Sequence, residues 1–218
     1  MHRISIILLL VFATGTLTAQ EGTKPLELRT EIGVQTNALF GRLTNNDGDG
    51  LVQNPYLLTG KLAFGNLALR AGIGGSHEKE VQHVEGFANS TTILAQRLDI
   101  RLGAERRFPL GDRWQGSLGL DAVADWTQDK TTNDSGFDVI TDTRDIQYIG
   151  GGMAAGLKYQ VTKRLSFCTE GYLYYTVGKI TDGQFFKNFP VGDDKIKESD
   201  TRAFKIGLPS ALYFVFEF

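Results

Sequence analysis

The last fifteen residues of this 218-residue chain alternate between two kinds of side chain with a period of two. That period belongs to the β-strand, in which successive side chains point to opposite faces. Ordinary strands contain about five or six residues, whereas a strand that crosses a bilayer at a tilt needs about nine to eleven. The segment therefore predicts a membrane-crossing strand. One face carries Phe204, Ile206, Leu208, Ser210, Leu212, Phe214, Phe216 and Phe218, and the other carries Lys205, Gly207, Pro209, Ala211, Tyr213, Val215 and Glu217.

Seven earlier segments follow the same rule. In the segment 97–105, apolar residues occupy the even positions and charged residues most of the odd ones. Strands that are apolar on one face only escape a search for long apolar helices. We therefore predict an all-β protein, a transmembrane antiparallel up-and-down β-barrel of about eight strands, with its apolar faces outward and its polar faces inward. The seven segments lie near residues 31–40, 56–64, 67–74, 97–105, 114–126, 149–159 and 165–177.

The connections between these segments alternate in length. Short ones are predicted at 65–66, 109–113 and 160–164, and long ones near 41–55, 75–91, 128–145 and 178–202. Outer-membrane barrels have short periplasmic turns and longer extracellular loops. With both termini in the periplasm, the pattern predicts four extracellular loops that are available for binding a ligand.

The short turns set an expected register. Gly65-Asn66 fits a two-residue hairpin with Gly at its first central position, which pairs Phe64 with Leu67. The same counting pairs Phe108 with Trp114 and Tyr159 with Leu165. Aromatic residues then form two outward belts, as membrane interfaces favour. The periplasmic belt comprises Phe64, Phe108, Trp114, Tyr159 and Phe218, and the opposite belt comprises Phe40, Tyr56, Trp126, Tyr175 and Phe204.

The N-terminus has the layout of a secretory signal peptide. Met1-His2-Arg3 is positively charged, residues 4–13 are apolar, and small residues at 16–20 permit cleavage, which we place after Ala19. The predicted divisions are therefore a signal peptide at 1–19, a short periplasmic segment at 20–29 and the barrel at 30–218. The expected location is the cell outer membrane, with its lipid bilayer as partner.

Composition limits the remaining options. Cys168 is the single cysteine, so no intramolecular disulfide can form. Beyond residue 19, 22 Lys and Arg face 25 Asp and Glu, so the chain lacks the basic field that a nucleic-acid partner requires.

The terminal segment Leu212–Phe218 resembles the C-terminal recognition strand of outer-membrane barrels, which ends in Phe. The chain after residue 19 is similar to the small eight-stranded barrels of the OmpA and OmpX kind. This resemblance implies folding by the barrel-assembly machinery, with an assembly signal at Tyr213, Phe214, Phe216 and Phe218, and it implies no particular activity. The peptidoglycan-binding domain that often follows an OmpA-type barrel is not expected here.

Charged residues at inward positions predict an ion-pair network in the lumen. Pairing about the turn at 109–113 sets Arg97 opposite Asp125 and Arg101 opposite Asp121, while Lys61 and Arg70 form a like-charge pair that needs an anion from across the lumen. The network either fills and neutralises the lumen or provides a gated path for ions, although eight strands leave little room for an open channel. Its predicted members are Lys61, Arg70, Arg97, Asp99, Arg101, Glu105, Asp121, Asp125 and Glu170, with Glu31 as a further candidate anion.

Two tyrosines are expected to pack over glycines across the sheet. Counting about the turn at 160–164 sets Tyr172 opposite Gly152 and Tyr174 opposite Gly150. Large rings that cover glycines on a neighbouring strand are a packing device, and a binding cleft is the alternative.

The predicted loops carry three further features. Asn46-Asp47-Gly48-Asp49-Gly50 resembles part of a calcium loop but lacks the later ligands. Two histidines with nearby carboxylates could hold a metal, or they could be solvated loop residues. Phe185, Phe186 and Phe189 could contact a ligand, lipid or partner, or pack over the barrel mouth. The histidine cluster comprises His77, Glu78, Glu80, His83 and Glu85.

The sequence thus favours a non-enzymatic outer-membrane barrel with a structural or surface-interaction role, no cofactor and no bound metal. The alternatives are a narrow barrel that transports an ion, a small solute or an apolar ligand, and a lipid-modifying enzyme. The enzyme hypothesis depends on His77 or His83 with Ser76 or Ser90, which match no catalytic motif.

Overall fold

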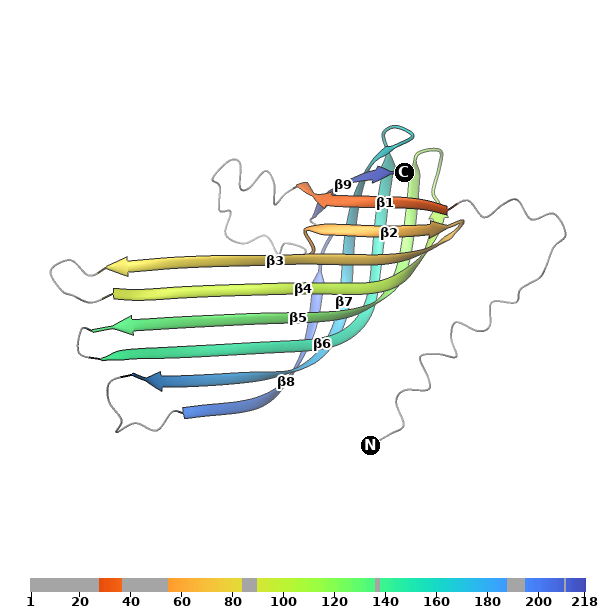
Figure 1. Ribbon diagram of the computed structural model, residues 1–218. Coiled ribbons are helices and arrows are strands. Elements are labelled where there is room, and N and C mark those ends of the chain that lie inside the picture. Colours follow the sequence, from red (N-terminus) through yellow and green to blue (C-terminus); the bar gives the residue numbers. More distant parts are fainter. Residues whose placement is uncertain (1–27, 37–54, 84–89, 136–137, 188–194, 210) are drawn as a thin grey trace, which may run out of the picture.

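The computed structural model describes residues 28–36, 55–83, 90–135, 138–187, 195–209 and 211–218. These residues form nine strands, and no helix among them is long and apolar enough to cross a membrane. The signal peptide lies outside the described residues. The strands are β1 (Leu28–Gln35), β2 (Leu58–Phe64), β3 (Leu67–His83), β4 (Ser90–Pro109), β5 (Trp114–Asp134), β6 (Val139–Gln160), β7 (Leu165–Phe186), β8 (Lys195–Gly207) and β9 (Leu212–Glu217) (Figure 1).

The strands form one antiparallel sheet that closes into a ring. Consecutive strands pair from β1 through to β8, and β9 pairs with both β7 and β1. The β1–β9 pairing, which sets Ile32 opposite Phe216, completes the ring. The predicted all-β antiparallel fold is confirmed.

The last predicted strand is divided into two, which raises the count from eight to nine. β8 pairs with β7 along Tyr172–Gln184, and β9 pairs with the earlier part of β7, along Leu165–Thr169. Pro209 lies between the two strands and has no N–H to offer to a ladder. Its carbonyl oxygen instead accepts a hydrogen bond from the Thr169 hydroxyl at 3.0 Å. β8 and β9 therefore act as two halves of one broken strand.

Outward and inward faces follow the alternation of the sequence. On β4, Leu102 is 61% exposed, whereas the neighbouring Arg101 is fully buried. On β9 and the residue after it, Phe216 and Phe218 face outward, whereas Tyr213 and Val215 are buried. The ring is thus apolar outside and charged inside.

The register agrees with the prediction at one turn and differs by two residues at the others. Gly65 has φ +60°, as the first central residue of the predicted hairpin requires, and Phe64 pairs with Leu67. At the β4–β5 turn, however, Phe108 stands opposite Gly116, because the Leu110 N–H donates to the carbonyl of Trp114 and five residues separate Pro109 from Gln115.

The predicted cross-strand pairs of β4 and β5 are consequently wrong. Arg97 stands opposite Thr127 and Arg101 opposite Val123, not opposite the two aspartates. The β6–β7 turn shifts in the same way, so that Tyr159 stands opposite Phe167 instead of Leu165. A displacement of two residues keeps every side chain on its face, which is why the inward set is unchanged.

Three of the four predicted long loops are wrong, because strands occupy most of their length. β3 runs to His83, β5 to Asp134 and β7 to Phe186. These extensions mix polar and apolar residues on both faces, as at Ile93 and Leu94 of β4, so they lack the alternation by which strands were predicted. Their ladders are supplemented by polar pairs across the strands, such as Thr91–Asn133 at 2.9 Å and Gln128–Asp145 at 2.8 Å. In Figure 1, β3 to β6 run far beyond the ends of β1 and β2. The fourth predicted loop lies almost wholly outside the described residues.

Candidate functional site

Large inward side chains are accommodated by glycines on the neighbouring strand. Gly72 stands opposite Arg101, and Gly103 stands opposite Asp121. A Cβ at Gly72 would lie 2.6 Å from Arg101 Nε, and a Cβ at Gly103 would lie 2.2 Å from Asp121 Oδ1. Alternation of small and large inward residues is how narrow barrels fill their interior. The glycines of β3 and β4 therefore make room for the charges.

Glu170 of β7 is the centre of the charge cluster in the lumen. Its carboxylate lies 3.0 Å from Lys61 Nζ, 3.1 Å from Arg70 Nη2 and 2.7 Å from Arg101 Nη2. The Glu170 side chain is 2% exposed. Three cations from β2, β3 and β4 thus converge on one buried anion.

Arg70 links this centre to two further anions. Its Nη1 lies 3.1 Å from Glu105 Oε2, and its Nε lies 3.1 Å from Asp121 Oδ1. The other Asp121 oxygen accepts a hydrogen bond of 2.6 Å from the Tyr174 hydroxyl. Lys61 Nζ is 2.9 Å from Glu105. The predicted like-charge pair of Lys61 and Arg70 is thus present, and anions from other strands compensate it.

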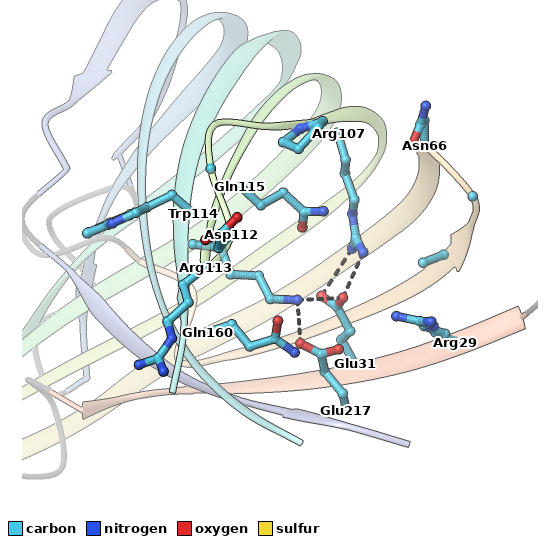
Figure 2. Close-up of a pocket in the computed structure, with 15 residues that line it drawn as sticks. Arg29, Glu31, Asn66, Arg107, Asp112, Arg113, Trp114, Gln115, Gln160 and Glu217 are labelled. Atoms are coloured by element: carbon cyan, nitrogen blue, oxygen red, sulfur yellow. Dashed lines mark hydrogen bonds and ion pairs between the residues drawn. The ribbon is translucent and has the colours of Figure 1, made fainter. Parts of the chain in front are cut away.

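A second part of the cluster lies at the end of the ring that carries the short turns. Arg107 of β4 reaches Glu31 of β1 through two hydrogen bonds, at 2.7 and 3.0 Å (Figure 2). Lys158 of β6 lies 2.9 Å from Glu31 and 2.6 Å from Glu217 of β9. A hollow of about 560 Å³ opens here, with Arg29, Asn66 and Trp114 on its rim.

The two parts together balance in charge. The five cations are Lys61, Arg70, Arg101, Arg107 and Lys158, and the five anions are Glu31, Glu105, Asp121, Glu170 and Glu217. We call these ten residues the lumen cluster.

Three of the predicted network residues lie nearer the long-strand end. Arg97 pairs with Asp99 on the same strand at 2.8 Å, and Asp125 pairs with Lys205 of β8. The Lys205 ammonium also lies 4.4 Å from the centre of the Tyr148 ring. The Arg97 side chain is 46% exposed, so this end of the lumen is more exposed to solvent than the lumen cluster.

Tyr56 lies inside the ring, although the alternation placed it on the outer belt. It precedes the first paired residue of β2, so the strand's alternation does not apply to it. Its ring lies 4.4 Å below the Arg101 guanidinium carbon, and its carbonyl oxygen accepts a hydrogen bond of 2.8 Å from the Tyr213 hydroxyl. Tyr56 is thus buried against Arg101 inside the ring. Phe40, of the same predicted belt, lies outside the described residues.

Sequence reasoning missed four charged members of these ion-pair networks. Arg107, Lys158, Lys205 and Glu217 all lie on the inward face of their strands. The same parity that selected Arg101 and Glu105 on β4 extends to Arg107, so the signal was present in the sequence.

The two tyrosines of β7 cover glycines, but not the predicted ones. Tyr174 stands opposite Gly152, and Tyr172 stands opposite Ala154 on one side and Gly207 on the other. A Cβ at Gly207 would lie 2.1 Å from the Tyr172 ring. The two rings stack on each other with their centres 4.6 Å apart, which makes them part of the packing of the inner wall.

The features assigned to loops lie mostly on strands. Phe185 and Phe186 end β7, whereas Phe189, Glu85 and the segment 46–50 lie outside the described residues. His77 Nδ1 lies 3.1 Å from Gln96 Nε2, and His83 stands opposite Ser90. Within the part of the chain that the structure describes, no three His, Cys, Asp or Glu side chains are grouped as a metal site needs.

The arrangement of the lumen can exclude water and ions from the ring. Its charges are held by one another across eight strands, so an ion that entered would have to displace an existing partner. Comparison with protein-family models, with curated proteins and with solved structures found no match.

Proposed function

We propose that this chain is an integral outer-membrane β-barrel protein with a structural or surface-interaction role. The observation that carries the proposal is the inverted polarity of the ring. Ile149 is 66% exposed and Leu102 61%, whereas Arg101 and Glu170 are buried. Soluble proteins rarely expose a continuous apolar surface of more than a few hundred Å². A lipid environment accounts for both faces of the wall.

The height of the apolar surface supports the same proposal. Outward residues of β5 begin at Trp114 and pass through Leu118 and Leu120 to Trp126. Twelve residues at about 3.4 Å each, tilted by about 45°, span about 29 Å, close to the hydrocarbon thickness of about 30 Å. Further aromatic pairs lie towards each end: Trp114 with Tyr159 at 4.7 Å and Tyr175 with Phe204 at 5.0 Å.

The choice of the outer membrane follows from two sequence features. The N-terminal segment 1–19 has the layout of a signal peptide, and the segment Leu212–Phe218 resembles the recognition strand of outer-membrane barrels. Both features belong to proteins that cross the inner membrane and are folded by the barrel-assembly machinery. The family resemblance to OmpA- and OmpX-type barrels remains part of this proposal.

The proposed role is one of surface interaction because the lumen is closed and the strands extend. The lumen cluster occupies the interior with paired charges, whereas β3 to β8 continue beyond the level of Trp126 as a largely polar sheet. A sheet of this size outside the membrane offers a surface for a ligand or partner. Enzymatic activity is not part of the proposal.

Reconstitution tests the membrane proposal directly. The chain without residues 1–19, refolded into phospholipid vesicles, should float with the lipid and give a β-sheet circular-dichroism spectrum. It should also migrate differently on unheated and heated gels, because a closed antiparallel ring resists unfolding by detergent. A monodisperse protein in buffer without detergent or lipid would contradict the proposal.

Transport is the second candidate, and the hollow at the short-turn end of the lumen favours it. We expect the lumen cluster to block conduction, because each ion would have to displace a buried ion pair. In planar bilayers the wild-type protein should therefore give no current steps. Regular single-channel steps in the wild type would replace the proposed role with transport.

A further inference from the structure

A hollow on the outer wall lies at the edge of the apolar surface nearest the strand extensions beyond Trp126. We call this direction along the strands upper. The hollow has a volume of about 550 Å³ and spans β3, β4, β5 and β6. We call it the outer-wall hollow. It lies at the level of Trp126, and Arg97, which pairs with Asp99, also lines it. Its lining includes His77, Gln96, Leu98, Trp126, Gln128 and Asp145.

The ladder register arranges this lining in two rows. The lower row is Leu98, Trp126 and Gln147, which stand opposite one another across β4, β5 and β6. The upper row is His77, Gln96, Gln128 and Asp145, one from each of four neighbouring strands. Both rows share the outward parity of the lipid-facing residues, such as Leu102 on β4. The hollow thus has an aromatic floor and a polar upper wall.

The polar groups of the upper row retain unused hydrogen-bonding atoms. The Gln96 amide nitrogen contacts His77 Nδ1 at 3.1 Å, and the Gln128 amide nitrogen donates to Asp145 Oδ1 at 2.8 Å. Within the described residues, the side-chain amides of Gln96 and Gln128 make these two contacts and no others. Each glutamine therefore keeps its carbonyl oxygen as an acceptor, and Asp145 keeps its second oxygen.

This combination matches the chemistry of a saccharide. The Trp126 side chain is 43% exposed, and an indole ring offers a flat apolar face that the C–H groups of a sugar can cover. The amide and carboxylate oxygens accept hydrogen bonds from hydroxyl groups. Strands about 4.8 Å apart space the acceptors over roughly 10 Å, enough for more than one sugar ring.

Exposed lysines around the hollow add a preference for negative charge. Lys79 and Lys130 lie one row above the upper row, on either side of Leu94, and Lys179 lies beside Gln147. All three side chains are exposed. They could meet phosphate groups carried by the sugar.

We propose that the outer-wall hollow binds the saccharide head group of an outer-leaflet glycolipid. This inference rests on the proposed outer-membrane location, because only there does the upper edge of the apolar surface meet a sugar-bearing lipid. The acyl chains would then lie along the apolar wall below Trp126, where Leu120 and Ile149 are exposed.

Trp126 provides the readout. The chain contains one other tryptophan, Trp114, so the variant Trp114→Phe leaves Trp126 as the sole indole. We would insert this variant into vesicles of phosphatidylcholine and titrate them with lipid A, or with phosphatidylglycerol at the same charge. Lipid A should shift Trp126 emission in a saturable way, and phosphatidylglycerol should not. Equal responses to the two lipids would overturn the saccharide assignment.

Two glutamine variants make a matched pair. Gln128→Leu removes an amide that bonds Asp145 in the hollow, whereas Gln184→Leu removes an amide that bonds Asp142 at 3.0 Å on the inner face. In the Trp114→Phe background, Gln128→Leu should weaken lipid A binding about tenfold, as expected for lost hydrogen bonds to the ligand. Gln184→Leu should leave it unchanged. Equal effects of the two variants would contradict the proposed site.

A third experiment distinguishes binding of a glycolipid from binding of a soluble saccharide. Deacylated, water-soluble saccharide from lipid A should bind at least tenfold more weakly than lipid A, because the apolar wall contributes only with acyl chains. Equal affinity would replace the glycolipid with a soluble saccharide and overturn the inference. Flotation of the same samples keeps the two proposals apart: failure to insert refutes the membrane location, whereas insertion without discrimination between lipids refutes only the glycolipid site.

Discussion

Replacing Glu170 by glutamine should lower the free energy of unfolding by about 3–5 kcal/mol, the usual cost of breaking a buried ion pair from one side. Glu170 is the anion to which Lys61, Arg70 and Arg101 converge. Glutamine keeps the shape but leaves three buried cations to share the remaining anions. The measurement is urea unfolding in phospholipid vesicles, followed by tryptophan fluorescence.

Glu198→Gln is the matched control, because it makes the same chemical change at an exposed position of β8. Its effect should lie within about 0.5 kcal/mol of zero, as for most surface substitutions. A double-mutant cycle with Arg101→Met should give a coupling of about 0.5–3 kcal/mol, the range for residues in contact. If Glu170→Gln and Glu198→Gln unfold alike, the lumen cluster does not hold the ring together.

Leu120→Arg should destabilise the protein in vesicles by about 2–4 kcal/mol, the cost of an arginine on the lipid face near the bilayer midplane. Leu120 lies halfway between Trp114 and Trp126 on β5 and is 50% exposed. In a soluble protein, an arginine at an exposed position of this kind would cost almost nothing. The sign and size of the change therefore report on the solvent that surrounds the wall.

Gln128→Arg provides the comparison on the same strand and the same face. It lies beyond Trp126, where a charge should cost only about 0–1 kcal/mol. The two variants can be compared by urea unfolding and by the yield of folded protein on unheated gels. A Leu120→Arg variant as stable as Gln128→Arg would show that no lipid contacts the wall at that height.

Which face of each strand points out of the ring could be predicted from the sequence, because this depends on the local alternation of apolar and polar residues. Leu102 and Arg101 differ in hydrophobicity, and only one arrangement buries the charge inside the ring and leaves the alkyl chain on the outer face. The register across the turns depends on hydrogen bonds within the turn, such as that from Leu110 to Trp114. Composition does not encode such a bond, so the predicted pairing of Arg101 with Asp121 was two residues out.

The partners of the charges could not be predicted because they lie across the ring. Arg70 and Glu170 are 100 residues apart in the chain and belong to strands that are not adjacent. Their contact depends on how the closed sheet brings opposite walls together, which no local pattern specifies. The extensions of β3 to β8 were missed for another reason: polar and apolar residues are mixed on both faces, so the extensions show no alternation.

The pairing of β1 with β9 has a consequence for how the protein folds. It is a seam between the first and last strands, and it brings together Glu31 and Glu217, two like charges that stand directly opposite each other. Lys158 of β6 contacts both carboxylates and so offsets the repulsion between them. Contacts so distant in sequence form late, because the loss of chain entropy precedes the gain in energy. We therefore expect the β1–β9 seam to form last, with Lys158 holding its two carboxylates together.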